Sequence, residues 1–201
     1  MPESGSRPTL GVRSGGRSAR VRQAVIDATV EELLTVGHEE VSLARIAEAA
    51  GVARSTVDRR WPSRGALLAD AVEQMAGEAS AAMAVPDLGD TRAELRVLVG
   101  AIAAALAERR LQVSLHAMIA VSGAEMREIR ARHWARREAV LRSVVARAIE
   151  RGDVAVDADP LHLGEMLTAP IWMRTFATGQ PVDEALLDRV VDDTLRAFAP
   201  R

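Results

Sequence analysis

Apolar residues recur along this chain at the spacing of an α-helix, and turn-forming residues separate the segments that show this spacing. The clearest pattern lies between residues 42 and 61. Ser42 is a good N-cap, because its hydroxyl can accept a free N–H of the first helical turn. Four apolar side chains then share one helical face: Leu43, Ile46, Ala47 and Ala50. Gly51, which tolerates a positive φ, ends this helix, and a second short helix is predicted over 53–60.

The second short helix presents a basic, hydroxyl-bearing face. Val52 and Val57 are expected to point inward. The polar side chains left for solvent or a partner are Arg54, Ser55, Thr56, Arg59 and Arg60. An apolar helix, a tight glycine turn and a second helix with such a face form a helix-turn-helix, whose second helix enters the DNA major groove.

The same periodicity predicts helices on both sides of this motif. The predicted ranges are 18–36, 63–83, 91–109, 111–121, 125–151, 160–178 and 183–198. Pro170 is expected to kink or interrupt its helix, because proline lacks an N–H and clashes with the preceding turn. Tyr is absent and Phe and Trp are scarce, whereas Ala, Leu, Arg and Glu abound, so the predicted fold class is all-α.

Composition narrows the chemistry that the chain can perform. Its 201 residues include no Cys, which excludes disulfides and thiolate metal sites. The four His are scattered without metal-ligand spacing, so we expect no metal and no cofactor. No P-loop, dinucleotide fingerprint or nucleophile elbow occurs. An enzyme is therefore not expected.

Charge is distributed unevenly along the chain. The formal net charge is -2, yet residues 1–22 carry five Arg against one Glu. Residues 1–17 are rich in Pro, Gly, Ser and Arg and are expected to form a disordered arm. There is neither a secretory signal nor an apolar run long enough to span a bilayer. We therefore expect a cytoplasmic protein with no membrane partner.

A set of short phrases accompanies the helix-turn-helix: Ile46-Ala47, Ala50-Gly51-Val52, Ser55-Thr56, residues 59–64 (RRWPSR) and Leu67-Leu68. Together they resemble the N-terminal domain of the tetracycline-repressor (TetR/AcrR) family. The resemblance implies an all-helical homodimeric transcriptional regulator, most often a repressor. Residues 18–64 would form the DNA-binding domain, and residues 65–201 a helical domain for ligand binding and dimerisation.

The resemblance also implies a set of contacts to double-stranded operator DNA. The predicted residues are Arg17, Arg20, Ser42, Arg54, Ser55, Thr56, Asp58, Arg59, Arg60, Trp61, Ser63 and Arg64. Arg54 and Arg59 are expected to read bases, because arginine donates two hydrogen bonds to guanine O6 and N7. The phosphate contacts implied by family position are Thr56, Arg60, Ser63 and Arg64.

Asp58 departs from the family pattern, which usually has Tyr at this position. A carboxylate there would repel a phosphate. It can instead pair with Arg54 one turn back, or accept a hydrogen bond from a cytosine amine. Asp58 is the feature that favours the alternative function, a helical ligand-binding or interaction module with weakened or lost DNA binding.

The C-terminal helices contain candidates for an effector pocket and for a dimer interface. An unknown apolar effector would contact Met75, Met83, Leu106, Met118, Trp134, Trp172, Met173 and Phe176. The last two helices of each subunit pair into a four-helix bundle in the family. Residues predicted for that surface are Leu163, Leu167, Leu186, Val190, Val191 and Leu195. For the pocket residues and the interface residues alike, the alternative interpretation is that they are ordinary core residues.

Overall fold

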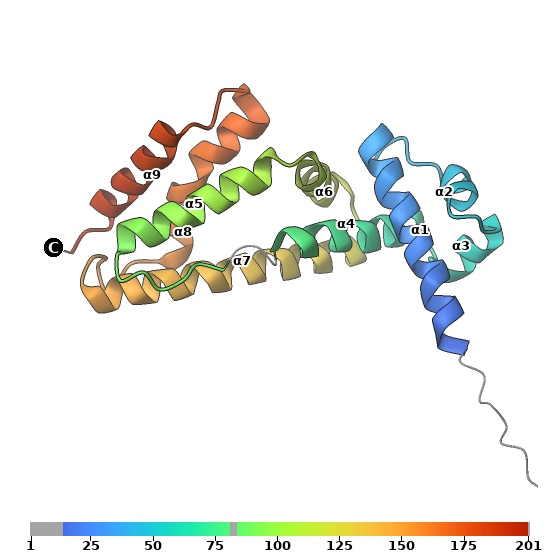
Figure 1. The fold of residues 1–201 in the computed structure, drawn as a ribbon, viewed down its shortest axis with the longest axis horizontal. Coiled ribbons are helices and arrows are strands. Elements are labelled where there is room, and N and C mark those ends of the chain that lie inside the picture. Colours follow the sequence, from blue (N-terminus) through green and yellow to red (C-terminus); the bar gives the residue numbers. More distant parts are fainter. Residues whose placement is uncertain (1–13, 81–83, 201) are drawn as a thin grey trace, which may run out of the picture.

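A computed structural model describes residues 14–80 and 84–200 (Figure 1). Its elements are α1 (Ser14–Val36), α2 (Leu43–Ala49), α3 (Arg54–Arg60), α4 (Arg64–Ser80), α5 (Thr91–Ala107), α6 (Arg109–Ala120), α7 (Ala124–Arg151), α8 (Pro160–Trp172), η1 (Met173–Thr178) and α9 (Glu184–Ala197). Helices α1 to α3 form a small unit at one end, and α5, α8 and α9 lie at the other. The all-α prediction is confirmed.

The predicted signals set the ends of the helices in the N-terminal unit. The Ser42 hydroxyl accepts the N–H of Arg45 at 3.4 Å and caps α2. Gly51 has a φ of 65°, in the left-handed region that the tight turn requires. Helix α1 begins at Ser14, earlier than the predicted residue 18, so Arg17 lies on a helix. The rest of the predicted arm, residues 1–13, lies outside the described residues.

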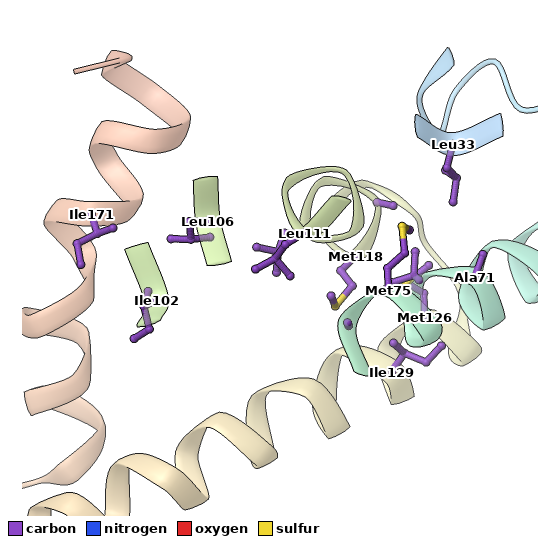
Figure 2. Close-up of a cluster of buried hydrophobic side chains, with 14 of the residues drawn as sticks. Leu33, Ala71, Met75, Ile102, Leu106, Leu111, Met118, Met126, Ile129 and Ile171 are labelled. Atoms are coloured by element: carbon purple, nitrogen blue, oxygen red, sulfur yellow. The ribbon is translucent and has the colours of Figure 1, made fainter. Parts of the chain in front are cut away.

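Helix α4 connects the N-terminal unit with the rest of the molecule. The Ser63 hydroxyl accepts the N–H of Ala66 at 3.0 Å at its start, as predicted. The helix packs against α1, α6 and α7, and it runs beside α7 in Figure 1. Figure 2 shows Met75, Met118, Met126 and Ile129 gathered where α4, α6 and α7 meet. This cluster links the N-terminal unit to the C-terminal helices.

Pro170 marks a change of helical type. The predicted helix over 160–178 is α-helical only as far as Trp172, and residues Met173–Thr178 form a π-helical segment. The N–H of Met173 is bonded to the carbonyls of both Ala169 and Pro170, at the end of α8. The predicted interruption is therefore present. Widened turns of this kind are frequent at functional sites.

A buried carboxylate holds the start of α5 against the end of α7. Glu94 is fully buried and accepts hydrogen bonds at 2.7 Å from Arg147 and from Arg151. Burial raises the pKa of Glu94, but the two guanidinium groups and the N–H of Leu88 lower it further, to about 2. This network fixes the connection that precedes α5.

Candidate nucleic-acid interface and ligand cavity

Helix α3 carries an exposed polar face on the outside of the N-terminal unit. Val57 is buried beneath it, whereas Ser55 and Arg59 are exposed. Asp58 accepts a hydrogen bond from Nε of Arg54 at 2.9 Å, and both side chains are about half exposed (53% and 48%). The i,i+4 pairing considered from sequence is therefore present. The carboxylate of Asp58 has a cationic neighbour on its own helix, and Arg54 keeps its terminal N–H groups for another acceptor.

Two arginines at the exit of α3 are engaged within the chain. Arg60 donates to the carbonyl and hydroxyl oxygens of Ser18, at 2.7 and 2.5 Å. Arg64 donates to the backbone carbonyls of His38 and Glu39. Both arginines therefore brace α1 and the connection after it, and their remaining donors are available to a phosphate.

Trp61, which was predicted as a DNA contact, is a core residue. Only 7% of its surface is exposed, and its indole N–H donates to Oδ2 of Asp70 at 2.9 Å. The same Asp70 oxygen accepts from Arg22 at 2.7 Å. A tryptophan has one donor, and here that donor is already used, so Trp61 supports the helix-turn-helix from behind.

The remaining predicted DNA contacts lie on or beside this unit. Arg17 and Arg20 are exposed on the first turns of α1. Thr56 is half-buried on α3, and Ser42 is half-buried at the start of α2. These side chains and the exposed face of α3 belong to one three-helix unit.

A cavity of about 580 Å³ lies between α5, α6, α7 and α8, outside the N-terminal unit. This volume is in the range of sites that hold drug-sized ligands. Its apolar lining comprises Leu98, Ile102, Leu115, Met118, Ile119, Trp134, Leu141, Leu161, Gly164, Leu167, Ala169 and Trp172. The charged residues at its wall are Arg130, Arg137, Glu138 and Glu165.

Three of the predicted pocket residues line this cavity: Met118, Trp134 and Trp172. Met75 and Leu106 are buried core residues, the alternative that sequence left open. Met173 is 57% exposed and is not part of the lining. Phe176 packs against Trp172 with ring centroids 4.8 Å apart. Met83 lies outside the described residues.

Close approach between α7 and α8 shapes one side of the cavity. A Cβ added at Gly164 would lie 2.2 Å from Cδ2 of Leu141, so glycine is what lets Leu141 occupy this place. Sequence reasoning did not single out Gly164, Leu141 or Arg137 as residues of a site. A glycine at a helix position otherwise suited to packing was the available signal.

Five of the six residues predicted for the dimer interface are core within one chain. They are Leu163, Leu167, Leu186, Val190 and Val191, which are all buried. Helices α8 and α9 pack on each other and on α5, and this packing covers the residues. Leu195 is half-buried and also packs against the core. The exposed apolar side chains of α8 and η1 are instead Leu161, Met166 and Met173.

The described residues also bear on metal binding and on membrane insertion. No group of three or more His, Asp or Glu in that part of the chain is arranged to hold a metal ion. None of the helices in residues 14–80 and 84–200 is long and apolar enough to cross a membrane.

Comparison with known sequence families gives two matches that divide the chain as the fold does. Residues 25–71 match the bacterial regulatory proteins of the tetR family. Residues 85–194 match the tetracyclin repressor-like C-terminal domain. The two matches cover the helix-turn-helix and the helices that enclose the cavity.

Individual proteins agree with these matches. The chain is 26% identical over 151 residues to the HTH-type transcriptional regulator AqdR of Rhodococcus erythropolis, covering 74% of this chain and 71% of that one. It is 28% identical over 178 residues to the DNA-binding transcriptional repressor TetR of Mycobacteroides abscessus, covering 86% and 90%. The crystal structure of the TetR family transcription regulator SCO0332 superimposes with a TM-score of 0.64 at 28% identity, covering 90% and 100%. Another solved structure of this fold, FadR of Bacillus subtilis in complex with stearoyl-CoA, has a TM-score of 0.65 at 16% identity, covering 87% and 95%. The chain belongs to the TetR family of transcriptional regulators.

Proposed function

We propose that this protein is a repressor that binds operator DNA as a homodimer and leaves it when a small molecule enters the cavity. The observation that carries the proposal is the exposed polar face of α3, set on a unit that α4 joins to the helices around the cavity. The repressor named TetR in Mycobacteroides abscessus matches most of this chain, which supports repression rather than activation.

In this proposal α3 lies in the major groove. Arg59 and the terminal N–H groups of Arg54 would read base edges, since arginine suits guanine O6 and N7. Ser55 and Thr56 add hydroxyl groups beside them. Phosphates would be held by Arg17 and Arg20 and by the free donors of Ser42, Arg60, Ser63 and Arg64.

The alternative function, a module that has lost DNA binding, is not favoured. Its one support was a carboxylate at position 58 that would repel phosphate. That carboxylate is paired with Arg54 at 2.9 Å. An aspartate that is neutralised by its neighbour can help to orient a base-reading arginine.

We propose that two copies associate through the exposed sides of α8, η1 and α9. Met166 and Met173 leave an apolar strip there that is 36% and 57% exposed. A dimer would place two α3 helices roughly 34 Å apart, one turn of DNA, and would select a near-palindromic operator. Met173→Glu is expected to convert a species of twice 21.6 kDa into one of 21.6 kDa, measured by light scattering during gel filtration.

Operator binding is tested with labelled DNA from the region upstream of the protein's own gene. Wild-type protein should retain this duplex at concentrations at least tenfold below those needed for a scrambled duplex of equal length, because specific binding exceeds phosphate-driven binding. Equal retention of both duplexes across a salt series would show that the chain does not recognise an operator there.

A further inference from the structure

An arginine without a carboxylate partner stands at the wall of the cavity. Arg137 lines the cavity from α7, and its Nε donates to Nε2 of His133 at 2.8 Å. Its Nη2 is buried and has no hydrogen-bond partner among the described residues. Burial, and then the nearby charge of Arg136, lower the pKa of Arg137, yet a guanidinium remains charged at neutral pH.

His133 does not neutralise this charge. It is fully buried, and because its Nε2 accepts from Arg137, a neutral ring must carry its proton on Nδ1. Burial, followed by the charges of Arg137 and Arg136, lowers the pKa of His133 to about 4. The imidazole is therefore a neutral acceptor that positions Arg137 and leaves its positive charge uncompensated.

The other charged groups of the cavity do not supply the missing anion. Glu138 accepts from Arg142 at 2.7 Å, one turn along α7. Glu165 is 78% exposed and lies 3.8 Å from His162 on α8. Arg130, the second cation of the lining, donates from Nε to the carbonyl oxygen of Met118 at 2.9 Å. In the described part of the chain, no salt bridge joins a carboxylate to Arg130 or Arg137.

Arg137 is half-buried with its Nη2 fully buried. A partly buried cation without an anion is costly, and an anion entering beside it recovers part of that cost. Most of the remaining wall is apolar, with Leu98, Ile102 and Trp172 among its residues. We propose that the cavity selects amphipathic carboxylates, with the carboxylate beside Arg137 and the apolar body along these side chains. This inference rests on the proposed function, in which the cavity is the effector site, and it names the chemical class of the effector.

The test compares acids with alcohols of the same apolar body. Decanoate and decanol form an aliphatic pair, and 1-naphthoate and 1-naphthol form an aromatic pair. Binding of each to the full-length protein is measured by isothermal titration calorimetry at pH 7, below micelle-forming concentrations. At least one acid should bind ten or more times more tightly than its alcohol, since a charge-assisted contact is available to the acid alone.

Two variants test whether Arg137 supplies the positive charge that binds the acid. Arg137→Met should reduce the affinity for the acid to about that for its alcohol and leave the affinity for the alcohol within about twofold. It should also raise the melting temperature of the ligand-free protein by a few degrees, because an uncompensated cation is removed from the interior. Arg136→Gln removes one positive charge from the neighbouring exposed position. This matched control should keep the preference for the acid and the affinity for DNA.

The possible outcomes distinguish two claims: that the cavity selects carboxylates, and that the cavity is the effector site. Alcohols that bind as tightly as acids, and release DNA as well, would overturn the selection of carboxylates and leave the cavity as an effector site. If all four probes fail to bind, the inference is overturned together with the assignment of this cavity. Acid binding that depends on Arg137 without release of DNA would uphold the inference and contradict the proposed release. The comparison of acid with alcohol on wild-type protein decides the matter even if Arg137→Met does not fold.

Discussion

At the scale of single residues, similar side chains on α3 have different partners, and these partners suggest their roles. Arg54 is paired with Asp58, and Arg60 is bound to Ser18. Arg59 is exposed and has no hydrogen-bond partner among the described residues. The three arginines of α3 therefore differ in their contacts. Arg54 is oriented by Asp58, Arg60 holds α1, and Arg59 is left for another partner.

Arg59 gives the first prediction. Arg59→Ala should weaken operator binding by about 1–3 kcal/mol and relax sequence preference at one base pair, as expected for loss of a base-reading arginine. The measurement is fluorescence anisotropy across a panel of operator variants at fixed salt, with Arg196→Ala on α9 as a control of equal charge. A uniform loss on all sequences would instead identify Arg59 as a phosphate contact.

Asp58 allows a sharper test. Because its carboxylate holds Nε of Arg54, Asp58→Tyr should alter sequence preference and lower operator affinity by roughly 1 kcal/mol. Asp58→Asn keeps an acceptor and should show a smaller change. Tighter binding by Asp58→Tyr with unchanged preference would mean that the carboxylate only repelled a phosphate.

His133 predicts how stability depends on pH. Its pKa is lowered from 6.5 to about 4 by burial and by two arginines, so the unfolded chain binds the extra proton first on acidification. Stability is therefore unaffected above pH 6.5, falls as the pH drops below it, and has lost roughly 2–3 kcal/mol by pH 4.5. Urea unfolding at pH 7 and 4.5 should show this loss in the wild type and a smaller one in His133→Gln. His162→Gln, at an exposed position, should behave as the wild type does.

At the scale of helices, sequence predicted most of the elements because caps and breakers act locally. Ser42, Gly51, Asp90 and Asp183 each end or begin a helix by contacts within a few residues. The cavity was not predictable in the same way. Met75 and Met118 both lie on inward faces, yet only Met118 meets the cavity, because the void depends on how α7 and α8 approach each other. Helical periodicity contains no information about that approach.

The ion-pair network at Glu94 gives the prediction at this scale. Glu94→Gln should lower stability by about 3 kcal/mol, because it leaves the partly buried Arg147 without its anion and Arg151 with only the exposed Asp87. The same carboxylate should sustain stability above pH 4.5, and its contribution should be lost as the pH falls toward 2, below the window of His133. Asp193→Asn breaks an exposed pair with Arg196 and should cost less than about 1 kcal/mol. Equal losses of stability in both variants would show that the buried network contributes no more to stability than an exposed ion pair does.

At the scale of the whole molecule, the proposed DNA-binding and effector sites belong to separate groups of helices. Helix α4 begins at the DNA-binding unit and packs on α6 and α7, which also form walls of the cavity (Figure 1). Met118 belongs to both environments, since it lines the cavity and lies in the buried cluster with Met75 (Figure 2). A ligand that displaces α6 or α7 would therefore act on α4. It can shift the protein between two arrangements only by its differential affinity for them.

Reciprocal coupling is the last prediction. If saturating effector weakens operator binding by some factor, saturating operator must weaken effector binding by the same factor. An ion pair between Arg132 on α7 and Glu73 on α4, at 3.0 Å and about half exposed, ties the two helices. Arg132→Ala should reduce the coupling factor by up to about fivefold, the effect of an exposed pair worth at most about 1 kcal/mol. Arg196→Ala, which breaks a pair within α9, should leave the factor unchanged. The comparison requires both dissociation constants, for operator and for effector, each measured with and without the other ligand. Unchanged coupling in Arg132→Ala, with intact binding of both ligands, would show that the α4–α7 ion pair does not transmit the signal.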